Sequence, residues 1–183
     1  MNHFFDVGAN AGQTFADFLN QTADYNGWTV WCFEPSPRHL AGLLQTAAKH
    51  AARYDIRICP FGLAEKGGLA RFYEKVDPRG DSLVGDFVVP NKESGYSVQI
   101  ITARCSDIIL NHIGPEDRAL VKLDCEGSEY GILNDLLESP AALAKITRIL
   151  VEWHGSELRN QEEAQRLMLR FAALGKPLER WVL

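Results

Sequence analysis

The segment Asp6-Val7-Gly8-Ala9-Asn10-Ala11-Gly12 restricts the fold of this chain more than any other. It follows an apolar run at 3–7 that predicts a buried strand, and it leads into a run whose apolar residues recur at helical spacing. Glycine at position 8 lets a ligand approach the backbone, and Gly12 permits a tight entry into the helix. The free N–H groups at the start of that helix can bind an anionic group. The segment therefore predicts a strand, a ligand-binding loop and a helix.

Strands and helices alternate along most of the chain. The expected strands cover residues 3–7, 28–33, about 55–60, 69–75, 97–103, 119–124 and 147–153. Helices are expected from Gly12, after an N-cap at Ser36, over about 105–113 and 128–138, and from a capping box of Asn160 with Glu163 to Gly175. This alternation predicts an α/β sandwich with a mainly parallel sheet. Because ligands bind such sheets beyond the carboxyl ends of the strands, the residues just after each strand are the candidate site residues.

Composition narrows the class of protein. The 183 residues are 46% hydrophobic, enough for one core, and we expect a single domain over 1–183. A net charge of −5 argues against binding to nucleic acids or anionic membranes. No signal peptide and no apolar run of about 20 residues is visible. The four cysteines are widely separated and are expected to be reduced core residues. These features together predict a cytoplasmic protein.

The glycine segment suits S-adenosylmethionine better than a dinucleotide. The G-x-G-x-x-G fingerprint would require glycines at 8, 10 and 13, where this chain has Gly8, Asn10 and Gln13. The carboxylate of Asp6 would repel a pyrophosphate, but it suits the ammonium and sulfonium groups of S-adenosylmethionine.

Two further loops are expected along this cofactor. Glu34, followed by Pro35, stands after the second strand, where a carboxylate can accept hydrogen bonds from both ribose hydroxyls. An exposed glutamate at a strand end is the alternative interpretation. The turn containing Gly62 and Leu63 follows the third strand and is expected near the adenine.

Acidic residues gather after the strand at 119–124. Asp124, Glu126 and Glu129 lie within six residues of one another, and such a group is costly unless its members are paired, hydrogen-bonded or used in function. Ser128 as an N-cap and Glu129 as a charge that complements the helix dipole would explain part of the pattern. They leave Asp124 and Glu126 unexplained.

The strand at 147–153 leads to Glu152 and His154, which would share one face of an extended strand. A lone histidine is commonly structural, but beside Glu152 at a cleft edge His154 becomes a candidate proton acceptor. Together with Asp124 and Glu126, these side chains could instead hold Mg²⁺ or Mn²⁺. Their spacing is not diagnostic, so no metal site is assigned.

Four blocks of the chain together resemble the FkbM-type family of class I S-adenosylmethionine-dependent methyltransferases. The blocks, which follow the family's order over about 4–175, are Phe5-Asp6-Val7-Gly8-Ala9-Asn10-Ala11-Gly12-Gln13, Phe33-Glu34-Pro35-Ser36-Pro37, Val121-Lys122-Leu123-Asp124-Cys125-Glu126-Gly127-Ser128-Glu129 and Val151-Glu152-Trp153-His154. The resemblance implies a Rossmann-like class I methyltransferase sandwich and O-methylation of a hydroxyl on a sugar or related small metabolite. Family members continue into a closing antiparallel hairpin. Here the C-terminal hairpin is expected to be incomplete, and the open sheet edge favours a homodimer.

The expected mechanism is in-line attack of an acceptor oxygen on the sulfonium methyl group. His154 is the first candidate for the base and Glu126 the second, with Glu152 as the partner that orients His154. The cofactor is expected to contact Asp6, Gly8, Asn10, Gly12, Glu34, Pro35, Gly62, Leu63 and Asp124. The polar stretch 76–96, with Arg79, Ser82 and Tyr96, is either a lid over the substrate or a surface loop.

Two other functions stay open on the sequence alone. One is a non-catalytic domain that binds S-adenosylmethionine without turnover, which the short ends favour and the intact carboxylate blocks oppose. The other is an NAD-dependent oxidoreductase, which Asn10 and Gln13 disfavour.

Overall fold

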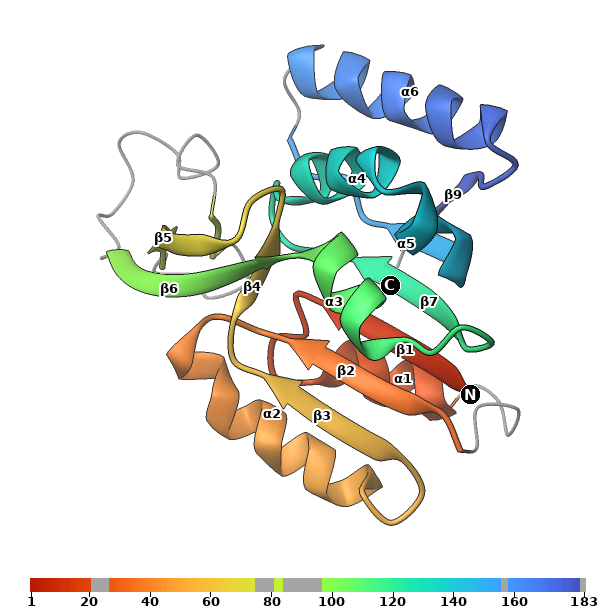
Figure 1. Ribbon diagram of the computed structural model, residues 1–183. Coiled ribbons are helices and arrows are strands. Elements are labelled where there is room, and N and C mark those ends of the chain that lie inside the picture. Colours follow the sequence, from red (N-terminus) through yellow and green to blue (C-terminus); the bar gives the residue numbers. More distant parts are fainter. Residues whose placement is uncertain (21–26, 75–80, 84–96, 156–157, 182–183) are drawn as a thin grey trace.

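The computed structural model describes residues 1–20, 27–74, 81–83, 97–155 and 158–181 (Figure 1). Its main sheet has six strands in the order β3-β2-β1-β7-β8-β9, and every neighbouring pair is parallel. These strands are β1 (Asn2–Val7), β2 (Thr29–Phe33), β3 (Asp55–Cys59), β7 (Arg118–Leu123), β8 (Ile146–Val151) and β9 (Leu178–Arg180). The predicted α/β fold with a mainly parallel sheet is confirmed.

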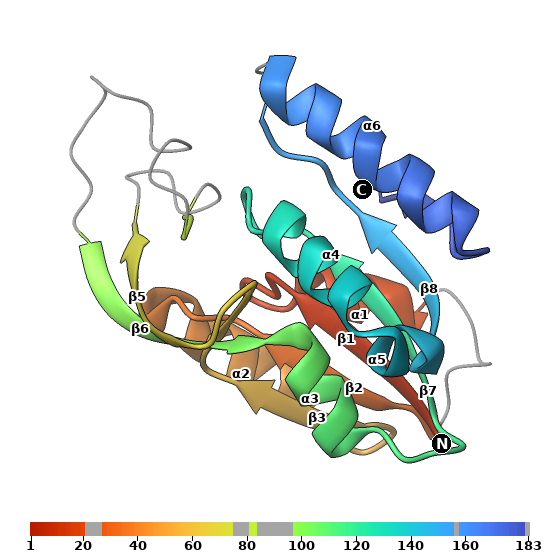
Figure 2. The ribbon, with the colours of Figure 1, turned by 45° about the horizontal axis from the view of Figure 1, so that its top comes forward.

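Helices cover both faces of this sheet (Figures 1 and 2). They are α1 (Gln13–Asn20), α2 (Pro37–His50), α3 (Cys105–His112), α4 (Glu129–Glu138), α5 (Pro140–Lys145) and α6 (Leu158–Ala173). Alternate strand residues serve two cores: Phe4 packs with α1 and α2, whereas Phe5 packs in the cluster that contains residues of α3, α4, α5 and α6. Burial on both faces is the reason that the central strands are continuously apolar.

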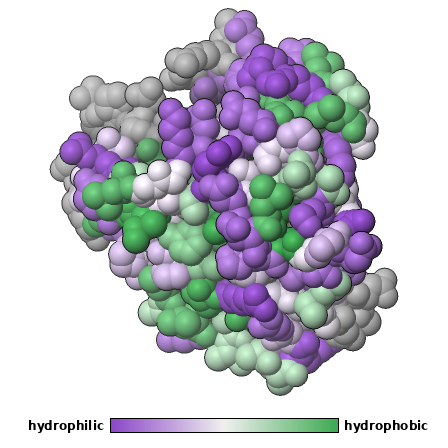
Figure 3. Space-filling model, in the orientation of Figure 1, coloured by the Kyte–Doolittle hydropathy of each residue, from purple (hydrophilic) through white to green (hydrophobic). Residues whose placement is uncertain are grey.

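A smaller sheet lies beside the carboxyl end of β3. It consists of β4 (Gly62–Ala64), β6 (Ser97–Arg104) and β5 (Gly68–Tyr73), in which β6 runs parallel to β4 and antiparallel to β5. One face of this sheet packs inward through Phe72 and Ile100, whereas the paired Leu69 and Ile101 stay exposed. Hydrophobic atoms are visible over β5 and β6 at the left of Figure 3.

The order of the strands brings two distant loops together. The chain moves from β1 through β2 to β3 in one direction and from β7 through β8 to β9 in the other, so the order reverses between β1 and β7. Gly8 lies at this point with φ +79°, and a Cβ there would be 1.8 Å from the carbonyl oxygen of Asp124. Only glycine therefore lets the loop after β1 lie against the loop after β7.

Some element boundaries differ from expectation. The capping box of Asn160 with Glu163 is wrong, because α6 already begins at Leu158 and Glu163 instead accepts hydrogen bonds from Arg166. The short elements β4 and α5 were missed, since three and six residues are too few to show a periodicity.

All four cysteines are free, as predicted. Among the helices of the described ranges, none combines the length and the apolar character needed to cross a membrane. β9 pairs with β8 and has no further neighbour within the described part of the sheet.

Candidate active site

A cleft of about 880 Å³ follows the carboxyl ends of the central strands. Small-molecule sites typically measure about 300–1,000 Å³, so this cleft can hold a cofactor together with a small acceptor. It brings together most of the predicted site residues, namely Gly8, Asn10, Glu34, Pro35, Gly62, Leu63, Asp124, Glu126, Glu152 and His154. Asp6 and Gly12 are not part of its lining.

A buried ion pair lies beneath the cleft between β1 and β7. Asp6 and Lys122 are register partners in adjacent parallel strands, so their side chains leave the same face of the sheet, and both are 0% exposed. The ammonium Nζ lies 2.9 Å from Asp6 Oδ1, 3.1 Å from Asp124 Oδ2 and 3.2 Å from the carbonyl oxygen of Gly8. Burial alone would lower the pKa of Lys122, but the two carboxylates raise it. Lys122 is therefore a cation, and Asp6 is its buried partner.

Gly12 supports the packing of the first helix. Its φ is +88°, and a Cβ there would be 2.6 Å from the ring of Phe15 and 3.1 Å from Leu43 of α2. This glycine lets α1 approach α2, and it affects the cleft only through the position of that helix.

Glu34 joins the loop after β1 to the loop after β2. The residue is 5% exposed, and its carboxylate accepts the N–H of Asn10 on Oε2 and the N–H of Ser36 on Oε1, each at 2.8 Å. Burial raises the pKa of Glu34, although both hydrogen bonds act in the opposite direction. An ionised carboxylate has about four acceptor sites, so acceptor capacity remains for a ligand. Ser36 occupies the N-cap position of α2, but its hydroxyl donates to Glu74 instead of capping the helix.

Glu129 makes contacts beyond those that the sequence predicts for it. It is 0% exposed, its Oε1 accepts the N–H of Cys125 and its Oε2 accepts the N–H of Gly127, each at 2.8 Å. The same Oε1 lies 2.9 Å from Nδ1 of His154. Glu129 lies in the first turn of α4, as expected of a charge that complements the helix dipole, but its carboxylate also turns inward and connects the acidic loop after β7, residues 124–129, to His154.

His154 lies among carboxylates. Its Nε2 is 3.5 Å from Glu126 Oε1, 3.7 Å from Asp124 Oδ1 and 4.0 Å from Glu152 Oε1. The partner that holds the ring is therefore Glu129 rather than Glu152, which corrects the predicted orienting group. Burial lowers the pKa of His154, but the hydrogen bond and charge of Glu129, followed by the other carboxylates, outweigh it and raise the pKa to about 9. At neutral pH the ring is an imidazolium.

Asp124, Glu152 and His154 also offer one ligand atom each within 4.8 Å of one another. Two carboxylates and an imidazole suit a divalent cation. The same atoms already lie in mutual ion pairs, so these contacts alone assign no metal.

The stretch 76–96 is described only in part. Arg79 and Tyr96 lie outside the described residues. Ser82 is buried, and its hydroxyl donates to the carbonyl oxygen of Glu126, which connects this stretch to the acidic loop. Asp81 and Leu83 line the cleft. Closure as a lid stays a prediction.

Replacing Glu129 by Gln is expected to lower the pKa of His154 toward its ordinary value of 6.5, since it removes the largest contributions that raise it. In the wild type, a folded-state pKa of about 9 stabilises the protein fully below pH 6.5, and this stabilisation is lost as the pH rises to 9. A pKa that differs by one between the folded and unfolded protein corresponds to about 1.4 kcal/mol. The free energy of unfolding should therefore fall over this window in the wild type and less in Glu129→Gln.

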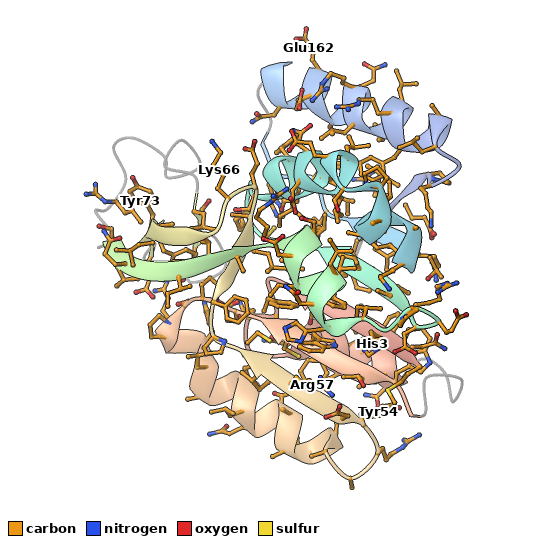
Figure 4. The ribbon with its side chains drawn as sticks, in the orientation of Figure 1. His3, Tyr54, Arg57, Lys66, Tyr73 and Glu162 are labelled. Atoms are coloured by element: carbon orange, nitrogen blue, oxygen red, sulfur yellow. The ribbon has the colours of Figure 1, made fainter. Side chains whose placement is uncertain are left out.

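Ring signals in NMR titrations give the pKa directly, and denaturant unfolding at several pH values gives the stability. Glu162→Gln is the matched control, because Glu162 is an exposed residue of α6 (Figure 4). A wild-type His154 that titrates near 6.5 would contradict the prediction.

Comparison with known proteins gives two matches. A family model described as the Methyltransferase FkbM domain matches residues 6–178. The crystal structure of methyltransferase FkbM from Methylobacillus flagellatus KT superimposes with a TM-score of 0.57 at 18% sequence identity. The superposition covers 97% of this chain and 38% of that chain, so this chain spans well under half of that protein's length. At this identity the likeness concerns the fold alone. No curated protein sequence matches significantly.

Proposed function

The chain belongs to the FkbM methyltransferase domain family, and on this basis we propose that it transfers a methyl group from S-adenosylmethionine to a hydroxyl of a small molecule, a sugar or related metabolite. One observation carries the proposal. The buried carboxylate of Glu34 and the imidazole of His154 line a single continuous cleft, one on the side expected for the cofactor and the other on the side expected for the acceptor.

The cleft fits a cationic cofactor. Glu34 has acceptor capacity for ribose hydroxyls, and Pro35 follows it in the lining. Gly8 and Asn10 would contact the cofactor along the loop after β1, and Asp124 would face it from the loop after β7. The acidic lining would repel the pyrophosphate of a dinucleotide.

The other predicted cofactor residues divide into two groups. Gly62 and Leu63 line the cleft beside Glu34 and would contact the adenine. Asp6 and Gly12 would act from beneath, Asp6 through Lys122 and Gly12 through the packing of α1.

When bound, S-adenosylmethionine supplies a methyl carbon that is electrophilic because it is attached to a sulfonium. The acceptor hydroxyl must lose its proton, and we assign this proton to Nε2 of His154. Glu129 holds the ring by its Nδ1–H, so that Nε2 faces the cleft. Glu126 and Glu152 are the alternative bases. With His154 as the base, turnover should rise with pH up to about 9, the pKa of its imidazolium.

Calorimetry with S-adenosylmethionine and with NAD tests the proposal. We expect binding of S-adenosylmethionine and no binding of NAD; no detectable binding of S-adenosylmethionine would overturn the proposed function. A methyl-transfer assay on a panel of sugars and small alcohols then separates an enzyme from a domain that binds the cofactor without turnover.

Two structural expectations also stay proposals. One is that residues 1–183 form a single domain. The other is that two copies associate through the sheet edge at β9, which has no neighbour beyond it within the described strands.

A further inference from the structure

Lys122 occupies an unusual position for a lysine. Its Nζ lies within 3.2 Å of three oxygens: the carboxylates of Asp6 and Asp124, and the carbonyl oxygen of Gly8, which accepts a hydrogen bond from it. The oxygens come from three separate places, namely Asp6 in β1, Gly8 in the loop after β1, and Asp124 in the loop after β7. One buried cation therefore holds both loops at the point where the strand order reverses.

A fully buried charge at this position is costly for the core. Burying an ion is costly, and replacing a buried ion pair by apolar residues is often neutral or stabilising. Val121 and Leu123, which flank Lys122 in β7, are apolar and fully buried. The lysine adds one contact to each loop, beside the backbone hydrogen bond that Asp124 N–H donates to the carbonyl oxygen of Val7 at 3.1 Å.

The geometry extends from Lys122 to the acceptor side of the cleft. Asp124 turns Oδ2 toward Lys122 at 3.1 Å and Oδ1 toward Nε2 of His154 at 3.7 Å. His154 in turn lies 2.9 Å from Glu129. Five charged groups therefore follow one another with alternating sign, namely Asp6, Lys122, Asp124, His154 and Glu129. Lys122 connects the loop after β1, residues 8–12, to the acidic loop after β7.

We propose that Lys122 is a positioning residue for methyl transfer. Its ammonium holds the Gly8 carbonyl and the Asp124 carboxylate at fixed positions, and so aligns the loop after β1, which would contact the cofactor, with His154. This inference rests on the proposed function for its catalytic meaning. Its structural part, the joining of two loops, holds in the protein without any ligand.

The test uses the double variant Asp6→Asn with Lys122→Met, which removes both fully buried charges, while the partly exposed Asp124 keeps His154 at 3.7 Å. Hydrogen exchange of the ligand-free protein should become faster at backbone amides of both 8–11 and 124–127. With cofactor and acceptor, kcat should fall about tenfold, because small misplacements of reacting groups are costly. The Kd for S-adenosylmethionine in calorimetry should change less than about threefold.

Lys145→Met is the matched control. Lys145 also donates to a backbone carbonyl, that of Gly114 at 2.7 Å, but neither residue lines the cleft. The control is expected to lower Tm without changing exchange at the two loops or kcat. If Lys122 has only a structural role, the double variant should also show a lower Tm with unchanged exchange at the two loops and unchanged kcat. That result would overturn the proposal.

If the double variant does not fold, Asp6→Asn with Lys122→Gln replaces it, since this pair keeps polar groups at both positions but removes the ammonium that contacts the Gly8 carbonyl and Asp124. Faster exchange at 8–11 supports the proposal, and unchanged exchange overturns it. Failure of the wild type to bind S-adenosylmethionine would instead refute the proposed function, and the exchange experiment separates the two cases.

Discussion

Turnover in methyl transfer is expected to fall by about 10²–10⁴-fold when His154 is replaced by Gln, the range typical of losing a general base. Glutamine can still donate a hydrogen bond to the buried Glu129 but cannot take a proton from the acceptor. His154→Ala should lower turnover equally and also reduce stability, because it leaves the carboxylate of Glu129 without the partner at 2.9 Å. Single-turnover kinetics at saturating cofactor measures the effect, and calorimetry should show nearly unchanged cofactor affinity.

The pH profile identifies the base. If His154 accepts the proton, wild-type turnover rises about tenfold per pH unit below about pH 9 and then levels off. The variants Glu126→Gln and Glu152→Gln should each reduce turnover less than His154→Gln does. Unchanged turnover in His154→Gln would remove His154 as the base, and a profile that is flat from pH 6 to 9 would assign the proton to Glu126 or Glu152.

Replacing Glu34 by Gln is expected to weaken binding of S-adenosylmethionine by about 10²–10⁴-fold. The carboxylate would bind the ribose through two charge-assisted hydrogen bonds, each worth about 1.5–3 kcal/mol. In the wild type the carboxylate accepts the backbone N–H groups of Asn10 and Ser36. In the variant, the NH₂ group of the glutamine amide would face one of these two donors and could not accept its hydrogen. The loops after β1 and β2 would then separate.

Calorimetry gives the affinity, and thermal unfolding shows whether the variant stays folded. Glu162→Gln again serves as the control, because Glu162 lies on α6 and points into solvent (Figure 4). A folded Glu34→Gln protein whose Kd lies within about threefold of the wild type would show that Glu34 does not bind the cofactor.

Much of the fold could be predicted because it depends on local patterns. The runs at 3–7 and 28–33 correspond to β1 and β2 within one residue, since strands buried on both faces are continuously apolar. Elements without a clear period were missed, as with the three residues of β4. The start of α6 was misplaced, because Asn160 and Glu163 match a capping signal that would start the helix at 161, whereas it begins at Leu158.

The candidate site could be predicted only to the level of its loops. Glu34, Asp124 and His154 each follow a strand, and a parallel sheet brings the ends of its strands to one edge. Ser128 and Glu129 resemble an ordinary helix start, so the sequence predicts for Glu129 only a charge that complements the helix dipole. Its partner His154 is 25 residues away, and no local pattern indicates that pair.

The sequence by itself determined which segments become strands and helices, and it placed carboxylates and an imidazole after the strands. The tertiary structure alone decided how these groups pair. Gly8 is needed because the backbone of Asp124 comes against it, and Lys122 is charged because the register sets Asp6 opposite it. The physical reason is range: propensity and periodicity act over a few residues, whereas the energy of a buried charge depends on the atoms around it, which come from distant parts of the chain.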